Sequence, residues 1–320
     1  MSEVSVIIPL YNKGRFIKRA LDSVFSQTYK DYEVVVIDDG STDDGPEIVK
    51  HYSDSRLRLI HQANAGPGAA RNRGMRESSG RFLVFLDADD EWFEGFLEVS
   101  FKTLVSNADC DVTAMSYFLG AERKDASGIF RGYGMVEGPW RLTKDISDYE
   151  LKYAIYIFHS SSTLCRREVL ERYGGFYCKN NCRYGEDYYL WLQVMLNHRI
   201  YRILRPLWWY HLEASELGVK DPACGALHPF LTDAETIRKN CPTGYEGLLE
   251  RWFALFALGI AHEAVSAGNI SKVRYLMRQF PLMRKFWLEY SKLKLKIWLP
   301  ALVPLVGSIK RRYFVVRDFF

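Results

Sequence analysis

The first 120 residues alternate between two hydrophobic periodicities, and this alternation constrains the fold more than any other feature of the chain. Short, continuous apolar runs lie at 4–10, 32–37, 57–60, 82–86 and 111–117. Such runs are typical of strands that are buried on both faces of a sheet. Between them, apolar residues recur at helical spacing, as over 16–25 and 93–104. Strands and helices that alternate in this way predict an α/β fold with a mostly parallel sheet and helices on both faces.

After residue 120 the pattern becomes irregular and then helical. Residues 121–150 lose both periodicities and contain four glycines, which predicts a mobile loop or an irregular insert. The elements predicted beyond it are an apolar segment at 153–164, helices at 166–173 and 186–197, a strand at 199–209, and helices at 245–267 and from 270 onward. We therefore divide the chain into an α/β domain at 1–220, a helical region at 221–280 and a basic tail at 281–320.

The composition is that of a folded protein with one basic end. Of the 320 residues, 48% are apolar and 26% are charged, which excludes disordered and collagen-like classes. The net charge of +4 is divided unevenly, because residues 270–320 contain 12 Lys plus Arg against 2 acidic residues. That segment therefore carries +10, which leaves −6 for residues 1–269. We expect a mildly acidic body and a strongly basic tail.

Neither the beginning of the chain nor its cysteines indicate secretion. No basic and apolar signal region follows Met1, and no run of about 18 uncharged apolar residues occurs. We therefore expect a reducing, cytoplasmic location without a membrane-spanning helix. Cys178 and Cys182 lie four positions apart, but no second pair with zinc-site spacing follows. Structural or neutral thiols are the expected interpretation of these cysteines.

Two acidic clusters follow two of the predicted strands. Asp38 and Asp39 come after the 32–37 strand, and Asp87, Asp89 and Asp90 come after the 82–86 strand. Ligands of such sheets bind beyond the carboxyl ends of the strands, so both clusters are expected at one ligand-binding edge. Ionised acids that lie close together need a compensating cation or hydrogen-bond donors. An Asp-x-Asp pair offers the hard oxygen ligands that suit Mg²⁺ or Mn²⁺.

The third strand-to-strand crossover contains a segment of small residues at 64–74, including Gly66 and Arg71. A backbone without large side chains can approach a ligand closely, and a helix that begins there offers N–H groups to a phosphate. Arg71 adds a charge-assisted donor that suits a diphosphate. A dinucleotide-binding fingerprint should instead follow the first strand, where the sequence reads Asn12, Lys13, Gly14. An oxidoreductase is therefore disfavoured.

Glu186 and Asp187 open the predicted helix at 186–197. Acids at this position can simply cap the helix and complement its dipole. A carboxylate that faces a metal-bound nucleotide also fits a general base for an alcohol nucleophile. In that second interpretation Asp187 activates the acceptor hydroxyl, and the cluster around Asp87 holds the leaving group.

Five segments resemble, in order, the motifs of the family 2 glycosyltransferases. They lie at 4–12, 36–43, 66–74, 86–90 and 185–187, within a region of about two thirds of the chain. The resemblance implies the GT-A fold, a Rossmann-like α/β fold with a mostly parallel central sheet, here followed by a C-terminal helical extension. It also implies transfer of a sugar from a nucleotide-sugar, usually a UDP-sugar, to an alcohol, with inversion and with Mn²⁺ or Mg²⁺ as cofactor.

The resemblance assigns roles to individual residues. Those assigned to the nucleotide-sugar site are Pro9, Tyr11, Asn12, Asp38, Asp39, Gly66, Arg71, Asp87 and Ala88. In this assignment Asp39 accepts a hydrogen bond from the uracil imide N–H, and Arg71 approaches the diphosphate. The residues assigned to the metal are Asp87, Asp89, Asp90 and His211. Asp187 matches the position of the catalytic base, with Glu186 as its neighbour.

The chain departs from the family pattern at two places. Many members carry Tyr-Arg-x-His-x-x-Ser after the last strand of the catalytic domain, whereas residues 210–215 read Tyr-His-Leu-Glu-Ala-Ser, which leaves the metal contact of His211 open. The string Gln-x-x-Arg-Trp of the processive members is missing from the sequence. We therefore expect an enzyme that adds a single hexose or N-acetylhexosamine.

The basic tail interleaves Lys and Arg with large apolar residues over 281–320, which suits an anionic membrane surface. A helical appendage with its charged face in water and a nucleic-acid site are the alternatives. The acidic body and the lipid-linked acceptors of similar enzymes favour the membrane. We expect peripheral attachment to the inner face of the cell membrane, synthesis of a surface polysaccharide or glycolipid, and no nucleic-acid partner.

Two other functions compete with glycosyl transfer. A catalytically silent scaffold could retain the nucleotide-sugar site and dock partner enzymes through the tail, but the acids needed for turnover are all present. A sugar nucleotidyltransferase would need a Gly-rich, basic loop after the first strand, and residues 12–15 are a poor match. The sequence leaves the sugar, the acceptor, the linkage and the oligomeric state open.

Overall fold

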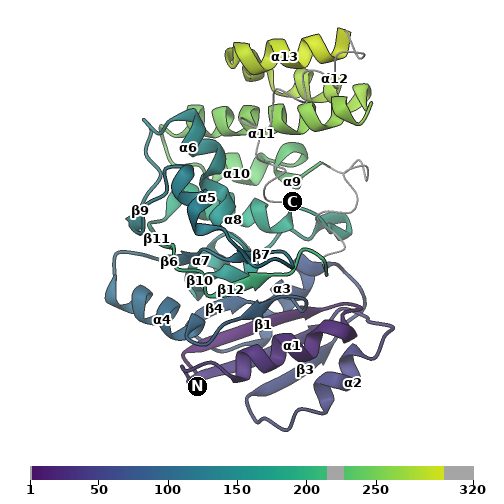
Figure 1. Cartoon of the computed structure of the whole chain (residues 1–320), viewed down its shortest axis with the longest axis vertical. Helices are drawn as coiled ribbons and strands as arrows, with labels where there is room; N and C mark the ends of the chain where they lie inside the picture. Colours follow the sequence, from purple (N-terminus) through teal and green to yellow (C-terminus); the bar gives the residue numbers. More distant parts are fainter. Residues whose placement is uncertain (1, 215–226, 299–320) are drawn as a thin grey trace.

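The computed structural model describes residues 2–214 and 227–298. A central sheet with flanking helices forms the lower part of the molecule in Figure 1, and a layer of C-terminal helices lies above it. The sheet has the strand order β3-β2-β1-β4-β10-β6-β11-β9. A second sheet has the order β5-β12-β7-β8. The predicted α/β class with C-terminal helices is confirmed.

The N-terminal half of the central sheet is parallel, as the sequence predicts. Its strands are β3 (Leu57–His61), β2 (Tyr32–Asp38), β1 (Val4–Leu10) and β4 (Phe82–Phe85). The helices between them are α1 (Gly14–Phe25), α2 (Gly45–Lys50) and α3 (Pro67–Glu77). A Cβ atom on Gly74 would lie only 2.3 Å from Ile7, so this glycine lets α3 pack closely on β1. Burial on both faces explains the continuous hydrophobic runs of β1, β2 and β4, whereas the edge strand β3, expected to be buried in the same way, is only partly buried.

The C-terminal half of the sheet is mixed. Its strands are β10 (Thr163–Arg166), β6 (Val112–Met115), β11 (Ile200–Ile203) and β9 (Gly138–Trp140). The run at 111–117 does form a strand, β6, but antiparallel β10 separates it from β4. The strands of the second sheet are β5 (Glu91–Trp92), β12 (Trp208–Tyr210), β7 (Phe118–Leu119) and β8 (Lys124–Asp125).

Two expectations about this half were wrong. Residues 121–150 form β8, α5 (Ser127–Gly132), β9 and the start of α6 (Asp148–Tyr153), not an irregular insert. Each element has six residues or fewer, too few for a hydrophobic period to repeat, and β9 is held by its pairing with β11. The strand expected at 199–209 is two strands, β11 and β12, in different sheets. Pro206 interrupts it, because proline cannot donate to a ladder.

The remaining helices belong either to the sheet domain or to the upper layer. They are α4 (Phe96–Ser106), α7 (Arg167–Arg172), α8 (Glu186–Asn197), α9 (Pro229–Thr232), α10 (Glu235–Lys239), α11 (Glu246–Ser266), α12 (Ile270–Gln279) and α13 (Trp287–Trp298). Short 3₁₀ turns lie at Ala154–Ile157, Ser160–Ser162, Lys179–Asn181 and Pro281–Lys285. The predicted helices at 166–173, 186–197 and 245–267 are confirmed.

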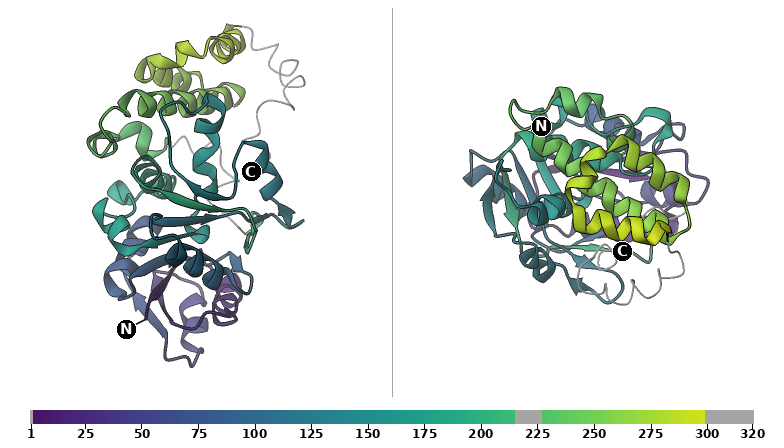
Figure 2. Two further views of the ribbon diagram at one scale, coloured as in Figure 1. Left: turned by 90° about the vertical axis from the view of Figure 1, so that its left-hand side faces the viewer. Right: turned by 90° about the horizontal axis from the view of Figure 1, so that it is seen from above.

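The long helix α11 connects the upper layer to the body. It contacts α6 on one side and α12, α13 and the 281–285 turn elsewhere along its surface. The left view in Figure 2 shows these helices as a separate layer at one end of the molecule. Part of the predicted basic tail, residues 281–298, belongs to this layer, and residues 299–320 lie outside the described residues. None of the helices in the described ranges combines the length and the hydropathy that spanning a bilayer requires.

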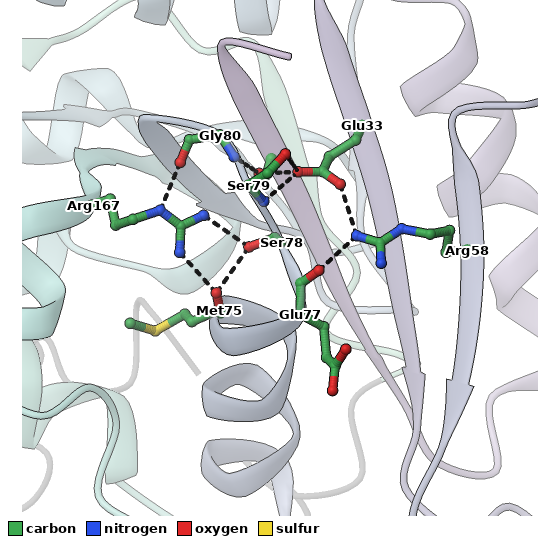
Figure 3. A network of polar contacts seen from close by, with 9 residues as sticks. Glu33, Arg58, Met75, Glu77, Ser78, Ser79, Gly80 and Arg167 are labelled. Carbon is green, nitrogen blue, oxygen red and sulfur yellow. Dashed lines mark hydrogen bonds and ion pairs between the residues drawn. The ribbon is translucent and has the colours of Figure 1, made fainter. Parts of the chain in front are cut away.

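A polar network fixes α3 at its C-terminal end (Figure 3). Arg167 donates to the carbonyl oxygens of Met75 and Gly80, at 2.7 Å each, and Arg58 donates to that of Glu77 at 2.6 Å. Cationic groups here satisfy free carbonyl groups and complement the helix dipole. Glu33 belongs to the same network, because it accepts hydrogen bonds from Ser79, Ser5 and Arg58. Burial acts to raise the pKa of Glu33, but these hydrogen bonds outweigh burial and lower that pKa to about 2. The network anchors α3 so that its N-terminus is held at the ligand-binding edge.

Candidate active site

A cavity of about 300 Å³ lies where β1, β2 and β4 end, at the carboxyl edge of the sheet. Most of the residues assigned from the sequence line it, namely Pro9, Tyr11, Asp39, Gly66, Arg71, Asp87, Ala88, Asp89, Glu186 and Asp187. The other four assigned residues do not line the cavity, but each is next in sequence to a residue that does: Asn12, Asp38, Asp90 and His211. Segments that lie more than 100 residues apart in the sequence therefore meet in one concave site, as expected for an open α/β sheet.

Asp39 organises the end of the cavity assigned to the nucleotide base. It is almost fully buried, and its carboxylate accepts hydrogen bonds from the backbone N–H groups of Ala65 and Gly66, both at 2.9 Å, and from Gln62 at 2.7 Å. A carboxylate offers roughly four acceptor positions. Three are used here, which leaves capacity for one more donor such as an imide N–H.

Asp38 and Asn12 shape the loops on either side of this subsite. Asp38 accepts a hydrogen bond from the N–H of Ser41 at 2.9 Å and contacts His61 Nδ1 at 2.8 Å. Asn12 accepts a hydrogen bond from the N–H of Thr42 at 2.8 Å, with its own backbone in the left-handed region at φ 51°. In the structure both side chains connect the loops after β1, β2 and β3. Their direct contact with a nucleotide stays a prediction.

Gly66 permits a close approach between two loops at the mouth of the cavity. Its φ is +91°, and a Cβ atom would lie 2.8 Å from the carbonyl oxygen of Cys182. Arg183 donates to Asn64 Oδ1 at 3.1 Å, which ties the same two loops together. The 177–185 segment thus lies against the N-terminus of α3, and a larger residue at position 66 would push it away.

Arg71 bridges two sides of the cavity. It is 4% exposed, and it donates to Asp87 Oδ1 at 2.6 Å and to Glu186 Oε1 at 2.7 Å. Burial acts to raise the pKa of Asp87, but Arg71, His159 and Lys13 outweigh it and hold that pKa below its ordinary value. The bridge joins the end of β4 to the start of α8. The diphosphate contact assigned to Arg71 stays a prediction.

The acids after β4 form a crowded, partly buried cluster. Asp89 pairs with Lys13, whose Nζ lies 2.9 Å from Asp89 Oδ2. Asp90 is 1% exposed and accepts a hydrogen bond from Ser161 Oγ at 2.7 Å. Burial, together with the charges of Asp89 and Asp87, raises the pKa of Asp90 well above its ordinary value. Buried carboxylates that repel one another favour a cation between them, because the positive charge lets all of them ionise together.

The geometry of the cluster fits a divalent cation. Asp87, Asp90 and His159 each offer one ligand atom, and these atoms lie within 4.8 Å of one another. Carboxylate oxygens suit Mg²⁺ and Mn²⁺. The residues assigned from the sequence include Asp87 and Asp90 but not His159. The only local hint of His159 is that it begins a polar run, 159–163, directly after an apolar segment.

His211 lies beside the acidic cluster, and its ring contacts two glutamates. Its Nδ1 lies 2.7 Å from Glu213 Oε1, and its Nε2 lies 3.4 Å from Glu91 Oε2. The ring stacks on Trp209 with centroids 4.1 Å apart, and the side chain is 4% exposed. Its backbone N–H donates to Asp90 Oδ1 at 3.3 Å. In this structure His211 supports the acidic cluster through its main chain, and a contact of its ring with metal stays a prediction.

Asp187 has the properties of a general base. It lines the cavity at the first turn of α8, and Oδ1 accepts a hydrogen bond from the N–H of Tyr188 at 2.8 Å. Burial raises the pKa of Asp187 to about 7, the nearby Glu186 adds to the rise, and Arg71 opposes it. A carboxyl group with a pKa near neutrality can both accept and release a proton under working conditions.

We therefore expect the sugar transfer that the family resemblance implies to depend on the ionisation of Asp187. Only the ionised carboxylate accepts a proton, so kcat/KM should fall about tenfold per unit as the pH drops below about 7 and level off above it. The check is the initial rate of nucleoside diphosphate release across neutral pH, at constant ionic strength and saturating Mn²⁺. A rate that stays flat down to about pH 5 would contradict the assignment, because an ordinary Asp titrates near 4.

A wall of aromatic side chains completes the cavity, and the sequence analysis did not find it. Its members are Tyr117, Tyr156, Phe158, Tyr184, Tyr188, Tyr210 and His228. The ring centroids of His228 and Tyr184 lie 4.4 Å apart, and those of Tyr156 and Tyr188 lie 6.4 Å apart. These residues come from several separate segments, so no local pattern marks them. They form a surface next to Asp187 that combines aromatic rings with tyrosine hydroxyl groups.

Comparisons with known proteins identify the family of this chain. The model of "Glycosyl transferase family 2" matches residues 5–174. The uncharacterized glycosyltransferase YibD of Escherichia coli is 42% identical over 113 residues, which cover 35% of this chain and 33% of YibD. The uncharacterized glycosyltransferase EpsJ of Bacillus subtilis is 31% identical over 194 residues, 58% of this chain and 53% of EpsJ. The match thus spans a third to about half of these two relatives.

Solved structures share the fold. S. aureus TarS 1–349 in complex with UDP-GlcNAc aligns with a TM-score of 0.58 and 19% identity, over 87% of this chain and 91% of that one. The mannosyltransferase PcManGT from Pyrobaculum calidifontis, in complex with GDP-Man and Mn²⁺, aligns with a TM-score of 0.53 and 19% identity, over 97% and 88%. These likenesses confirm the expected GT-A fold. The family model covers more than half of the chain, and the chain therefore belongs to glycosyl transferase family 2.

Proposed function

We propose that this protein transfers one sugar from a UDP-sugar to a hydroxyl group of a saccharide or lipid-linked acceptor, with inversion and with the help of Mn²⁺ or Mg²⁺. One observation carries this function: a single cavity joins the nucleotide end around Asp39, the acids after β4 and the carboxylate of Asp187 with its pKa near 7. A binding protein has no need of a base with that pKa beside its ligand.

The residues divide the chemistry between two sides of the cavity. Asp187 accepts the proton of the incoming hydroxyl, which then attacks the anomeric carbon from the face opposite the leaving diphosphate. Asp87 and Asp90, together with His159, would hold a divalent cation that would stabilise the negative charge of the departing diphosphate. Asp89, which pairs with Lys13 in this structure, is a metal ligand by the family motif alone. Arg71 fixes Asp87 and Glu186 relative to each other. A one-step displacement of this kind inverts the anomeric centre.

The choice of donor is supported by the structural neighbours. TarS 1–349 has been solved with UDP-GlcNAc and with UDP, which supports a UDP-sugar here. PcManGT has been solved with GDP-Man, so a GDP-sugar is the alternative that an experiment must separate. The carboxylate of Asp39 accepts three hydrogen bonds and keeps capacity for one further donor, which suits the single imide N–H of uracil. A single addition follows from the missing processive motif.

The location follows from the charge distribution. The acidic body and the +10 of residues 270–320 support attachment to the inner face of the cell membrane, where surface polysaccharides and glycolipids are started on lipid carriers. The transferred sugar thus becomes part of a surface polysaccharide or glycolipid.

A calorimetric titration of UDP tests the nucleotide and metal assignments together. We expect UDP to bind with Mn²⁺ present and to bind at least about tenfold more weakly after EDTA, equivalent to about 1.4 kcal/mol. GDP titrated in the same way separates the two donor classes. Asp89→Asn should weaken metal-dependent UDP binding, whereas the control Asp145→Asn changes an exposed acid outside the cavity and should have no effect.

Each outcome of the titration has a defined meaning. Binding that ignores EDTA would contradict the role of the cation. No binding of either nucleotide by a folded sample would contradict the proposed donor. UDP binding without any release of UDP from UDP-sugars, in the presence of lipid and saccharide acceptors, would favour the catalytically silent scaffold.

A further inference from the structure

The last described helix, α13, carries an apolar face that points away from the protein. Its inner side docks on α11, with Tyr290 and Leu293 buried. Its outer side exposes Trp287 (71%), Trp298 (78%) and two leucines, Leu288 (51%) and Leu295 (43%). Among the residues that the structure describes, four of the nine exposed large apolar side chains therefore lie on this one helix.

The four side chains lie in one stripe along the helix, as a pair near each end. At helical spacing, positions 287, 288, 291, 295 and 298 share this side, and position 291, between the two pairs, is a serine. Lys292 and Lys294 flank the stripe on its two sides, and Arg284 and Lys285 are exposed in the turn before the helix. We call this surface, made of Trp287, Leu288, Leu295 and Trp298 with these basic residues, the α13 face.

The charge around this face indicates an anionic partner. Residues 270–298 contain eight Lys plus Arg and one acid, Glu289. Tryptophan beside lysine is the composition that binds at the boundary between lipid headgroups and acyl chains. Because α13 is packed on α11, the stripe is already in place, and docking would order few side chains.

We propose that the α13 face docks this protein on an anionic lipid bilayer, with the two tryptophans at the headgroup level. This inference rests on the membrane attachment proposed above and names its contact surface. The helix lies at one end of the molecule (Figures 1 and 2), so a flat bilayer meets it without touching the sheet domain.

The path from the α13 face to the cavity is short. On α11, Phe256 packs against His228 of the cavity wall with ring centroids 5.1 Å apart. Further along the same helix, His262 Nε2 lies 3.1 Å from the carbonyl oxygen of Glu289 on α13. One helix, about 10 Å across, therefore lies between the cavity wall and α13, and α13 itself lies between that helix and the bilayer. The cavity wall would then lie about two helix diameters from the membrane surface, a distance that a lipid-linked acceptor must span.

Vesicle flotation of the full chain tests the surface. Wild type is compared with Trp287→Ser/Trp298→Ser on vesicles of phosphatidylcholine alone and of phosphatidylcholine mixed with phosphatidylglycerol. The matched control is Val105→Ser/Val136→Ser, which removes two exposed apolar side chains elsewhere on the protein. We expect wild type and the control to float with the anionic vesicles. The tryptophan variant should partition at least about tenfold less, and Lys294→Gln about fivefold less at low salt.

Three results would overturn the assignment. Wild type that stays unbound on anionic vesicles excludes the lipid surface. Equal flotation of the tryptophan variant places the contact elsewhere, for example in residues 299–320. Self-association that the tryptophan variant abolishes, in the absence of vesicles, makes a second copy of the chain the partner. UDP titration of every variant is independent of these outcomes, so failure of the surface and failure of the nucleotide site can be told apart.

Discussion

Asp187→Asn is expected to lower kcat for sugar transfer by about 10²- to 10⁴-fold, the range that general base catalysis supplies. The amide keeps the size of the carboxyl group and can still accept the hydrogen bond from the N–H of Tyr188, but it cannot take a proton at neutral pH. UDP affinity with Mn²⁺ should change little, because Asp187 is assigned to the acceptor hydroxyl and not to the nucleotide or the metal. Initial rates of UDP release and the UDP titration measure the two quantities.

The neighbouring acid provides the test of this assignment. Glu186→Gln removes the charge next to Asp187 and weakens the contact with Arg71, but it leaves the base in place. If Asp187→Asn kept near-full turnover while Glu186→Gln lost it, Glu186 would have to be the base. The exposed Asp145→Asn serves as a control for the loss of one acid.

Arg71→Met is expected to lower the free energy of unfolding by about 3–5 kcal/mol and to abolish transfer. The guanidinium is buried, and its removal leaves the carboxylates of Asp87 and Glu186 without their shared partner. Breaking a buried ion pair from one side has a cost of this size, because a charge stays buried without compensation. Urea unfolding followed by circular dichroism measures the change.

Arg73→Met is the matched control for this substitution. Arg73 lies two residues further along α3, its side chain is 39% exposed, and it pairs with Glu77 at 2.7 Å. An exposed pair of this kind contributes less than about 1 kcal/mol. Equal destabilisation by the two variants would show that the bridge to Asp87 and Glu186 adds nothing. Arg71→Lys keeps the positive charge but cannot donate to both carboxylates as a guanidinium does. Its free energy of unfolding should lie between those of wild type and Arg71→Met.

Local sequence patterns predicted the parallel half of the sheet well. The strands β1, β2 and β4 are continuous apolar runs because both of their faces are buried, and such runs are visible without knowledge of the fold. The edge strand β3 was also predicted, although it is only partly buried. The predictions around residues 121–150 and 199–209 were wrong because those elements are short and are stabilised by pairing with distant strands. A period needs several repeats before it can be recognised.

The candidate site was predictable where each residue follows a strand or opens a helix. Asp39, Asp87, Asp89 and Asp187 meet these conditions, and the structure brings all four to one cavity. His159 does not meet them, because its place beside Asp87 depends on the insertion of β10 between β4 and β6.

The sequence by itself determined the fold class, the ligand-binding edge and the family, because these depend on local periodicity and on motifs in a fixed order. The tertiary structure decided which acids share a partner and which aromatic side chains face Asp187. The bridge from Arg71 to Glu186 spans 115 positions of the chain, and the outward face of α13 exists only because α11 covers the other side. Such contacts arise when distant segments pack together, and no local pattern encodes that packing.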